Sequence, residues 1–427
     1  MKIAIAGYGV EGEASYRYWS ADSSNEVVIA DQRDPDNKLP ENVKAIIGED
    51  AFEELDGFDL VIRTAGLAPD KIKTNGKIWS ATNEFFAKCS APIIGVTGTK
   101  GKGTTASIID SILKMAGKKT WLVGNIGGRP ALDMLDKIQP DDVVIYELSS
   151  FQLWDIERSP QVAVVLFIEQ EHLDVHAGME DYLEAKSNIA RYQNPDNLVV
   201  YNQNNRYALE ISELSPARKI GYPNPSAGHV KNNGFYYNEQ KICSIDTLKI
   251  PGVHNQENAC AAITVAWQFT QNTSAIEKGL ADFQGLPHRL QLVRTVNEVS
   301  YYDDSIATTP SAAIAALRAF DNPKVIILGG SFKGSDFDEL GQELTKHQVK
   351  AILIGKESIP IAKSCKKAGF RNFEILEEPT VKELVDKAKT LAEPGSVVLL
   401  SPAAASFGLF KDYKDRGDKF QQEVNKI

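Results

Sequence analysis

Residues 95–105 read GVTGTKGKGTT and form the most informative stretch of the chain. They follow a short apolar run, residues 92–96, which predicts a buried parallel strand. They precede residues 106–116, whose apolar side chains recur at helical spacing before Gly117 ends the helix. A strand, a glycine-rich loop and a helix N-terminus together wrap a polyphosphate with backbone N–H groups, while a lysine neutralises its outer charge. The stretch therefore predicts a nucleoside-triphosphate loop.

The loop departs from the usual phosphate-loop pattern at one position. That pattern ends in Lys followed by Ser or Thr, whereas Gly103 follows Lys102 here. The missing hydroxyl ordinarily binds magnesium, so Thr104 or Thr105 would have to supply that oxygen. A glycine-rich turn without a ligand is the structural alternative.

Composition limits the classes of protein that remain. The chain has 427 residues, more than one core usually supports, so two or three domains are expected. A net charge of −10 disfavours a nucleic-acid footprint, and the four cysteines lack the paired spacing of a zinc site. The chain has no apolar run of roughly 18 residues, the length that spans a bilayer, and it starts with a strand rather than a signal peptide. We expect a cytoplasmic monomer that binds neither nucleic acid nor membrane.

A second glycine motif lies at the start of the chain. Residues 2–6 predict a strand that enters a GxGxxG pattern at residues 7–12, and a second strand at residues 26–30 ends at Asp31. This is the dinucleotide-binding signature, with Asp31 near the position of a ribose-binding acid. The same geometry suits any ligand with a pyrophosphate. A nicotinamide site and another nucleotide-diphosphate site are equal alternatives at this point.

Strand and helix patterns alternate along the rest of the chain. The strands are nearly all apolar, as expected for a parallel sheet that helices cover on both faces. The pattern predicts an α/β protein with three domains, at residues 1–90 (Rossmann-like), 91–284 (a P-loop ATPase-like parallel sheet) and 285–427 (Rossmann-like). Further strands are expected at residues 59–63, 120–123, 142–146, 162–167, 198–201, 299–302, 324–328, 351–354 and 397–400, helices near 78–88 and 255–269, and a hairpin at Asn233-Gly234.

Three polar residues are candidates for chemistry. Glu147 ends a predicted strand, and a carboxylate beside a triphosphate loop is a natural magnesium ligand, although a solvent-exposed acid is the alternative. His172 is a candidate ligand for a second cation, but a single histidine is more often structural. Lys186 lies on a predicted helix, where spacing alone favours a solvated face.

Taken together, the motifs of this chain resemble those of Mur ligases, ATP-dependent enzymes that add amino acids to the UDP-linked precursor of peptidoglycan. The resemblance extends over essentially the whole chain, and ELSSFQL, LPHR and the segment from Ser401 are most similar to the D-glutamate-adding branch. The motifs, in family order, are GVTGTKGKGTT, GNIGG from Gly124, ELSSFQL from Glu147, EHLDVH from Glu171, EAK from Glu184, HNQEN from His254, GLPHR from Gly285 and SPAAASFGLFKDYKDRG from Ser401.

The resemblance implies what each domain binds. The N-terminal domain would hold the uridine diphosphate of the substrate, with no nicotinamide. The implied contacts to this substrate are Gly9, Val10, Glu11, Asp31, Gln32, Arg33 and Gly66, extended toward the sugar and alanine by Asn125 and Ser149.

ATP, magnesium and D-glutamate are the other implied ligands. Around ATP the resemblance implies Gly98, Thr99, Lys100, Gly101, Lys102, Gly103, Thr104, Asn255, Asn258, Arg289 and Asp304. Two magnesium sites would use Thr104, Glu147, His172 and a carbamylated Lys186, the last three acting with Lys102 as catalytic residues. D-Glutamate would contact Thr308, Lys333, Ser406 and Tyr413.

The implied reaction moves the terminal phosphate of ATP onto the alanine carboxylate and then lets the amine of D-glutamate displace phosphate. Lys100 stands where the family commonly has asparagine, Ile306 where a lysine lies near the amino-acid site, and Tyr413 where the family has phenylalanine. Ile306 leaves open the alternative of a related Mur ligase with another amino-acid donor. Gly103 leaves open the alternative of a family member that binds UDP-sugars without turnover. A folate polyglutamate ligase is disfavoured by the N-terminal domain, and a nicotinamide-dependent oxidoreductase would leave Lys102 and Glu147 without a role.

Overall fold

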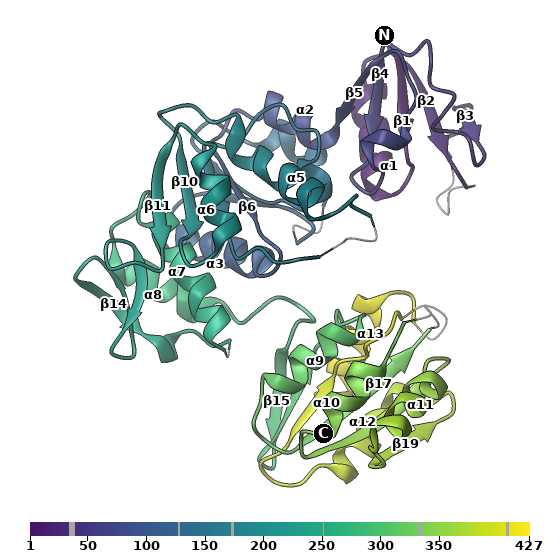
Figure 1. The fold of residues 1–427 in the computed structure, drawn as a ribbon, viewed down its shortest axis with the longest axis vertical. Coiled ribbons are helices and arrows are strands. Elements are labelled where there is room, and N and C mark those ends of the chain that lie inside the picture. Colours follow the sequence, from purple (N-terminus) through teal and green to yellow (C-terminus); the bar gives the residue numbers. More distant parts are fainter. Residues whose placement is uncertain (34–38, 127–128, 172–174, 251, 332–334, 407–409) are drawn as a thin grey trace. The chain divides into compact units, whose positions relative to one another are not determined.

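The computed structural model describes residues 1–33, 39–126, 129–171, 175–250, 252–331, 335–406 and 410–427, and these residues form two compact units (Figure 1). Unit 1 comprises Met1–Lys249 and Val253–Phe283, and unit 2 comprises Ile250–Gly252 and Gln284–Ile427. No helix in these described ranges is both long and apolar enough to cross a membrane.

The first sheet of unit 1 is parallel, with strand order β3-β2-β1-β4-β5. Alternate residues of β1 face opposite sides, so that Ile3 and Ile5 join one apolar cluster and Ala4 and Ala6 another. The order reverses at β1, which places the glycine motif at the switch point where ligands collect. The elements are β1 (Lys2–Ala6), α1 (Val10–Ser20), β2 (Glu26–Asp31), β3 (Lys44–Ile47), β4 (Leu60–Arg63), η1 (Pro69–Lys71), β5 (Lys77–Ser80) and α2 (Ala81–Lys88).

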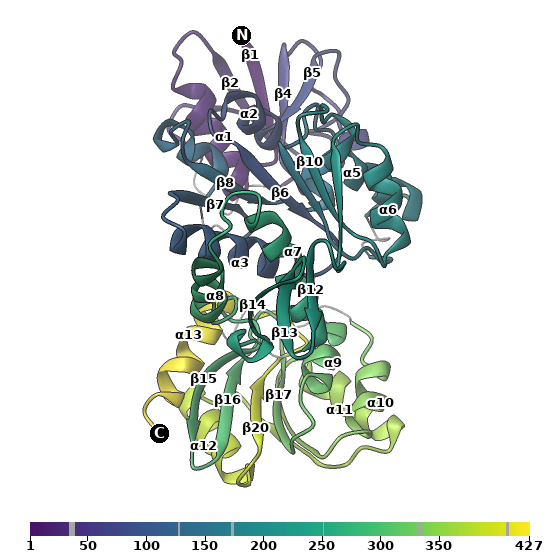
Figure 2. The ribbon, with the colours of Figure 1, turned by 90° about the vertical axis from the view of Figure 1, so that its left-hand side faces the viewer.

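The second sheet of unit 1 is also parallel, with order β11-β10-β9-β6-β8-β7. The strand order switches sides at β6, the strand before the phosphate loop, because β8 lies on one side of β6 and β9 on the other. Its strands are β6 (Ile93–Thr97), β7 (Thr120–Gly124), β8 (Val143–Glu147), β9 (Val162–Val165), β10 (Leu198–Asn202) and β11 (Arg218–Tyr222). Its helices are α3 (Lys102–Met115), η2 (Ala131–Lys137), α4 (Ser150–Leu153), α5 (Met179–Arg191), α6 (Arg206–Glu213), η3 (Ile245–Thr247), α7 (Val253–Ala266) and α8 (Thr273–Asp282). Figure 2 shows α3 and α8 lying side by side.

The two sheets of unit 1 share one apolar core. Ile5 of β1 and Phe85 of α2 belong to the same buried cluster as Val144 and Tyr146 of β8. The edge of the Phe85 ring meets the Tyr146 ring at a centroid distance of 5.4 Å. This shared core makes the first two predicted domains one compact unit, whereas the boundaries at residues 90 and 284 stay predictions.

A small antiparallel sheet, β12 (Gly228–Lys231), β13 (Gly234–Tyr237) and β14 (Gln240–Ser244), confirms the predicted hairpin. Its turn is one residue earlier than expected. Asn232 and Asn233 have φ angles of 47° and 55°, and Gly234 already begins the strand. The type I′ turn, whose twist matches that of the flanking strands, needs positive φ angles at both central residues, and asparagine tolerates them.

Unit 2 is a single six-stranded sheet of order β15-β16-β20-β17-β18-β19, parallel except for the β15–β16 pair. Alternate strand residues face two helical layers: Ile326 and Leu328 lie with α9 to α11, and Val325 and Ile327 with α12 and α13. The elements are β15 (Gln291–Val296), β16 (Val299–Asp303), α9 (Pro310–Arg318), β17 (Lys324–Gly330), α10 (Asp338–Leu344), β18 (Val349–Gly355), α11 (Ser358–Ala368), β19 (Phe373–Leu376), α12 (Val381–Leu391), β20 (Val397–Leu400) and α13 (Tyr413–Val424).

The predicted α/β class with doubly wound parallel sheets is confirmed. The strands that the sequence did not predict all lie at sheet edges, and they are β3, β5, β11, β14, β15 and β19. Edge strands keep one side in solvent, so they lack the apolar run that identifies a buried strand. For the same reason the predicted helix at 78–88 is wrong over residues 78–80, which belong to β5 and precede α2.

Candidate active site

Two glycines shape the phosphate loop between β6 and α3. Gly98 and Gly101 have φ angles of 154° and 85°, a region that favours glycine, and Gly101 is the N-cap of α3. A Cβ atom at Gly101 would lie 2.3 Å from Asn258 Oδ1, and one at Gly98 would lie 2.7 Å from the Cβ of Leu166. Close approach of α7 to Gly101, and of the residue that follows β9 to Gly98, therefore requires glycine at both positions.

Lys102 and Gly103 are the first two residues of α3, and the lysine side chain lies over the loop. Its Nζ donates to the backbone oxygens of Gly98, at 3.1 Å, and Thr99, at 2.9 Å. Thr104 and the adjacent threonine are buried in the first turn of α3. The hydroxyls nearest to the loop at the helix N-terminus are therefore those of Thr104, which is 6% exposed, and Thr105, which is fully buried.

Thr99 and Lys100 join the loop to the segment that follows β9. Thr99 Oγ1 accepts a hydrogen bond from the backbone N–H of Glu169 at 2.9 Å and lies 3.0 Å from the hydroxyl of Tyr182 on α5. Lys100 forms an exposed ion pair with the Glu169 side chain at 2.6 Å. The extra cation at position 100 is therefore paired with a neighbouring acid.

Glu147 ends β8, the strand next to β6, and its register partner on β6 is Val96. Only 6% of Glu147 is exposed. The carboxyl ends of parallel neighbours meet at one sheet edge, so this carboxylate lies at the same edge as the phosphate loop. The expected strand-end position is confirmed, and the alternative of an acid in solvent is wrong.

Lys186 is buried on α5, so the solvated face favoured by helical spacing is wrong. It is 1% exposed, and its Nζ donates to Gly98 O at 2.9 Å and lies 4.6 Å from the Tyr182 ring centre. Burial lowers the pKa of the Lys186 amine well below 10.5 and the charge of Lys102 lowers it further, whereas Glu171 and Glu147 act in the opposite direction. The neutral amine is therefore easier to form at Lys186, beside the phosphate loop, than at a solvent-exposed lysine.

Two asparagines of α7 complete the part of the loop surroundings that lies in unit 1. Asn258 Nδ2 donates to Asn255 Oδ1 at 3.3 Å, and Asn258 contacts the loop at Gly101. Both belong to the predicted ATP contacts. The structure therefore brings Lys102, Thr104, Glu147, Lys186 and this asparagine pair around one loop.

The N-terminal glycine motif has a different architecture. Gly7 has a φ angle of 92°, and a Cβ atom there would lie 2.3 Å from Thr64 Oγ1. Around Gly9 and Gly66 a Cβ atom would meet nothing within 4 Å. Val10 follows Gly9 and is 70% exposed, so the loop faces open space where a ligand can approach.

Asp31 organises the neighbouring turn through both of its carboxylate oxygens. Oδ2 accepts the backbone N–H of Tyr8 at 2.7 Å, and Oδ1 accepts that of Arg33 at 3.1 Å. Gln32 Nε2 donates to Glu49 O at 3.0 Å. Three of the residues predicted to contact the uridine diphosphate, Asp31, Gln32 and Arg33, thus form one folded corner at the end of β2.

Glu11 joins the glycine loop to the turn after β4. Its Oε2 accepts the backbone N–H of Ala65 at 3.3 Å. Burial raises the pKa of the Glu11 carboxyl, while that hydrogen bond and the charge of Arg63 lower it.

Asn125 and Ser149 lie after β7 and β8, at the same edge of the second sheet. Asn125 is exposed in the turn that ends β7. Ser149 is the N-cap of α4, where its Oγ accepts from the backbone N–H of Gln152 at 3.2 Å and Gln152 Oε1 accepts from the Ser149 N–H at 3.0 Å. This capping box fixes the orientation of the serine.

In unit 2, Asp304 is a buried acid that follows Asp303, the last residue of β16. Its Oδ2 accepts from Ser401 Oγ at 2.6 Å, and its Oδ1 accepts from the backbone N–H of Leu290 at 3.1 Å. Burial raises the pKa of Asp304 to about 7, although both hydrogen bonds and the charge of Arg289 lower it. Arg289, the other predicted ATP contact of unit 2, therefore faces an acid that is partly protonated at neutral pH.

Three of the predicted amino-acid contacts are described, and they lie in unit 2 in loops or at the start of a helix. Thr308 directly precedes Thr309, the N-cap of α9, Tyr413 begins α13, and Ser406 is 4% exposed. The carbonyl of Tyr413 accepts from Ser305 Oγ at 2.7 Å. Two predicted residues, His172 and Lys333, lie outside the described residues. Within the described part, no group of three or more His, Cys, Asp or Glu side chains forms a metal site.

Sequence patterns missed several buried polar groups around these loops. Arg63, at the end of β4, is fully buried, and its only sequence signal is a charge that ends an apolar strand. His176 joins Ser150 and Asp181, with 3.0 Å from Nε2 to Ser150 Oγ and 2.9 Å from Nδ1 to Asp181 Oδ2. Arg416 of α13 is also buried, and it donates to Ser305 Oγ at 2.9 Å. The partners lie up to 111 residues away along the chain, so local patterns do not reveal them.

Comparison with known proteins identifies the family. Residues 96–266 match the Mur ligase middle domain, and residues 288–404 match the Mur ligase glutamate ligase domain. The UDP-N-acetylmuramoylalanine--D-glutamate ligase of Clostridium tetani is 34% identical over 449 residues, which cover 100% of this chain and 97% of the relative. The chain belongs to the Mur ligase family. The ligase of the same name from Ruminiclostridium cellulolyticum is 35% identical over 453 residues, covering 100% of this chain and 97% of the relative.

The fold of this Mur ligase is found in solved structures. The MurF ligase from Thermotoga maritima in complex with ADP has a TM-score of 0.59 and 18% identity, and the match covers 99% of this chain and 95% of that one. Family membership confirms the expected enzyme class, an ATP-dependent ligase. These relatives give no support to a nicotinamide-dependent oxidoreductase.

Proposed function

We propose that this Mur ligase joins D-glutamate to UDP-N-acetylmuramoyl-L-alanine at the expense of ATP. The observation that carries the proposal is the similarity to relatives of that name over the full chain, at 34 to 35% identity. The arrangement around the phosphate loop supports it, because Lys102, Glu147 and Lys186 meet at the ends of β6 and β8.

The first chemical step is activation of a carboxylate. A carboxylate is a poor electrophile at neutral pH, so the terminal phosphoryl group of ATP is transferred to an alanine carboxylate oxygen and ADP is released. The backbone N–H groups of the loop and the Lys102 ammonium offset the phosphate charge, which is the main service a protein gives to phosphoryl transfer. Asn255 and Asn258 border the same loop and supply amide donors.

The second step forms the amide. The amine of D-glutamate attacks the carbonyl carbon of the acyl phosphate, loses a proton, and phosphate departs with the electron pair of the broken bond. Ser406, Tyr413, Thr308 and Lys333 are proposed to hold this amino acid. Ile306 has no charge to offer a second carboxylate, so a related amino-acid donor remains the second candidate function.

The donors around the loop fit a magnesium ion. Magnesium prefers oxygen ligands, and the Glu147 carboxylate and the Thr104 hydroxyl are both buried oxygen donors beside the loop. We propose that these two residues and His172 hold the ion. When bound, magnesium would offset the charge of the phosphates.

We also propose that Lys186 is carbamylated. A neutral amine attacks carbon dioxide and releases one proton, which turns the side chain into an anionic oxygen donor. The lowered pKa of Lys186 favours the neutral amine that this reaction needs. The mass of the native protein in bicarbonate tests the modification, and Lys186→Ala should regain turnover with formate or acetate. An unmodified lysine in the active protein would refute it.

The proposed function is tested by phosphate release with ATP, magnesium and UDP-N-acetylmuramoyl-L-alanine across a panel of amino acids. We expect release with D-glutamate and none with L-glutamate, and we expect Lys102→Ala to abolish it. If another amino acid alone supports release, the donor assignment falls while the ligase class stands. If none does, the proposed function is wrong.

A further inference from the structure

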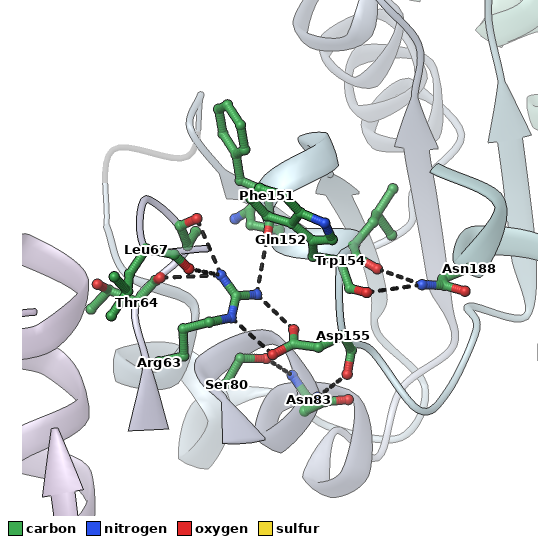
Figure 3. Close-up of polar contacts among 12 residues, drawn as sticks. Arg63, Thr64, Leu67, Ser80, Asn83, Phe151, Gln152, Trp154, Asp155 and Asn188 are labelled. Atoms are coloured by element: carbon green, nitrogen blue, oxygen red, sulfur yellow. Dashed lines mark hydrogen bonds and ion pairs between the residues drawn. The ribbon is translucent and has the colours of Figure 1, made fainter. Parts of the chain in front are cut away.

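Arg63 has an unusual number of partners for a single side chain. It ends β4 with no exposed surface, and the structure brings two separate segments of unit 1 to its guanidinium (Figure 3). One segment is the turn at residues 64–67, which directly follows β4. The other is α4 with the residues after it, about 90 residues further along the chain.

The contacts to the turn are all with backbone oxygens. Arg63 Nη1 donates to Leu67 O at 2.8 Å and lies 3.2 Å from both Thr64 O and Ala65 O. Three carbonyl groups of one turn therefore point at one nitrogen atom. This arrangement fixes the turn that contains Gly66.

The contacts to the α4 segment use the rest of the guanidinium. Nε donates to Asp155 Oδ2 at 2.8 Å and Nη2 to Asp155 Oδ1 at 2.6 Å, a two-point ion pair, and Nη2 also donates to Phe151 O at 3.0 Å. The Phe151 carbonyl is one of the last four of α4, which have no partner within a helix. Arg63 therefore completes the C-terminal end of a one-turn helix whose N-cap is Ser149.

Further side chains fix the same α4 segment from two other helices. Asn83 of α2 donates to Asp155 O at 2.8 Å and accepts from the backbone N–H of Glu157, also at 2.8 Å. Asn188 of α5 donates to Leu153 O at 3.0 Å. The position of α4 is thus set mainly by side chains of β4, α2 and α5.

We propose that Arg63 is a positioning residue that sets the distance between the two walls of the UDP-substrate site, the turn with Gly66 and the helix that begins at Ser149. This inference rests on the proposed function, because Gly66 and Ser149 are proposed contacts of the UDP substrate. A guanidinium suits the role, since its planar fork offers five N–H donors in fixed directions. Without the guanidinium, the distance between the two walls can change even if each wall keeps its own conformation.

The test is the variant Arg63→Lys, which keeps the charge but donates from a single atom. We expect the dissociation constant of UDP-N-acetylmuramoyl-L-alanine, measured by calorimetry, to rise about tenfold to a hundredfold, because the preorganised spacing of the two walls is lost. The dissociation constant of ATP should stay within about twofold, because no Arg63 hydrogen bond reaches the phosphate loop among the described residues. The matched control is Arg318→Lys, which alters a two-point pair with Glu343 in unit 2 and should change neither constant.

The outcomes separate this inference from the proposed function. If the wild-type protein does not bind the UDP substrate, the proposed function fails. If it binds, and Arg63→Lys binds equally well or loses both ligands to the same extent, the positioning role is wrong and the function stands. Should Arg63→Lys not fold, Asp155→Asn takes its place with the same selective loss expected, because asparagine keeps the shape of the side chain and removes its charge.

Discussion

Thr104 and Thr105 are adjacent hydroxyls in the first turn of α3, and their surroundings differ. Thr105 is fully buried, and its Oγ1 has no hydrogen-bond partner among the described residues. Thr104 retains 6% exposure beside the loop, where Gly103 has no hydroxyl to offer. Of the two, Thr104 is the one able to reach a ligand.

Thr104→Val should therefore lower kcat by about a hundredfold or more, as expected when one oxygen that holds a phosphate or its cation is removed. The matched control is Thr105→Val, which should leave kcat unchanged and raise or preserve the unfolding temperature, because it removes a buried hydroxyl without a partner. Phosphate release and thermal unfolding measure both variants. Equal activity of Thr104→Val and wild type would show that the loop works without that hydroxyl.

At the scale of elements, helix α3 follows the phosphate loop and packs against α8 so closely that backbone atoms of the two helices are near contact. A Cβ atom at Gly279 of α8 would lie 2.5 Å from the Cα of Ile112 on α3. Ser111 Oγ also donates to Gly279 O at 2.9 Å. Because Ile112 backbone atoms cannot move aside like a flexible side chain, glycine is needed where the two helices cross (Figure 2).

Gly279→Ala should destabilise the protein by about 1 to 3 kcal/mol, the usual cost of overpacking. Without this contact, alanine in a helix would instead be more stable than glycine by about 1 kcal/mol. Chemical denaturation gives the free energy of unfolding. Lys278→Ala, an exposed site on the same helix, serves as the control and should be nearly neutral. A stabilised Gly279→Ala variant would contradict the close approach.

At the scale of the whole molecule, each compact unit has apolar clusters of its own. Unit 2 also contains two titrating groups that act in the same direction. Burial raises the pKa of Asp304 to about 7 from 3.8, so between these values the folded state holds a proton that the unfolded state has released. The hydrogen bond to Asp303 raises the pKa of His288, so its stabilisation is present at low pH and is lost as the pH rises through the folded pKa.

We therefore expect two calorimetric transitions without ligands, with the unit 2 transition falling as the pH rises from 5 to 8. For Asp304 the expected slope is up to about 1.4 kcal/mol per pH unit. Asp304→Asn keeps the shape of the side chain and should flatten the dependence of that transition alone. A unit 2 transition that rises with pH, or an Asp304→Asn variant with the wild-type slope, would contradict the assignment.

Local pattern determined much of this protein. The apolar runs predicted the central strands, and the glycine loops and the polar residues at strand ends predicted Lys102, Thr104 and Glu147 at one sheet edge, because backbone geometry follows from neighbours in sequence. The tertiary structure alone decided which polar groups are buried and what they contact. Lys186 lies on an amphipathic helix but faces the loop from behind, and Arg63 meets Asp155 across 92 residues. The burial and pKa of Lys186 and the ion pair of Arg63 depend on segments that are distant in the chain, so the periodicity of the local sequence cannot predict them.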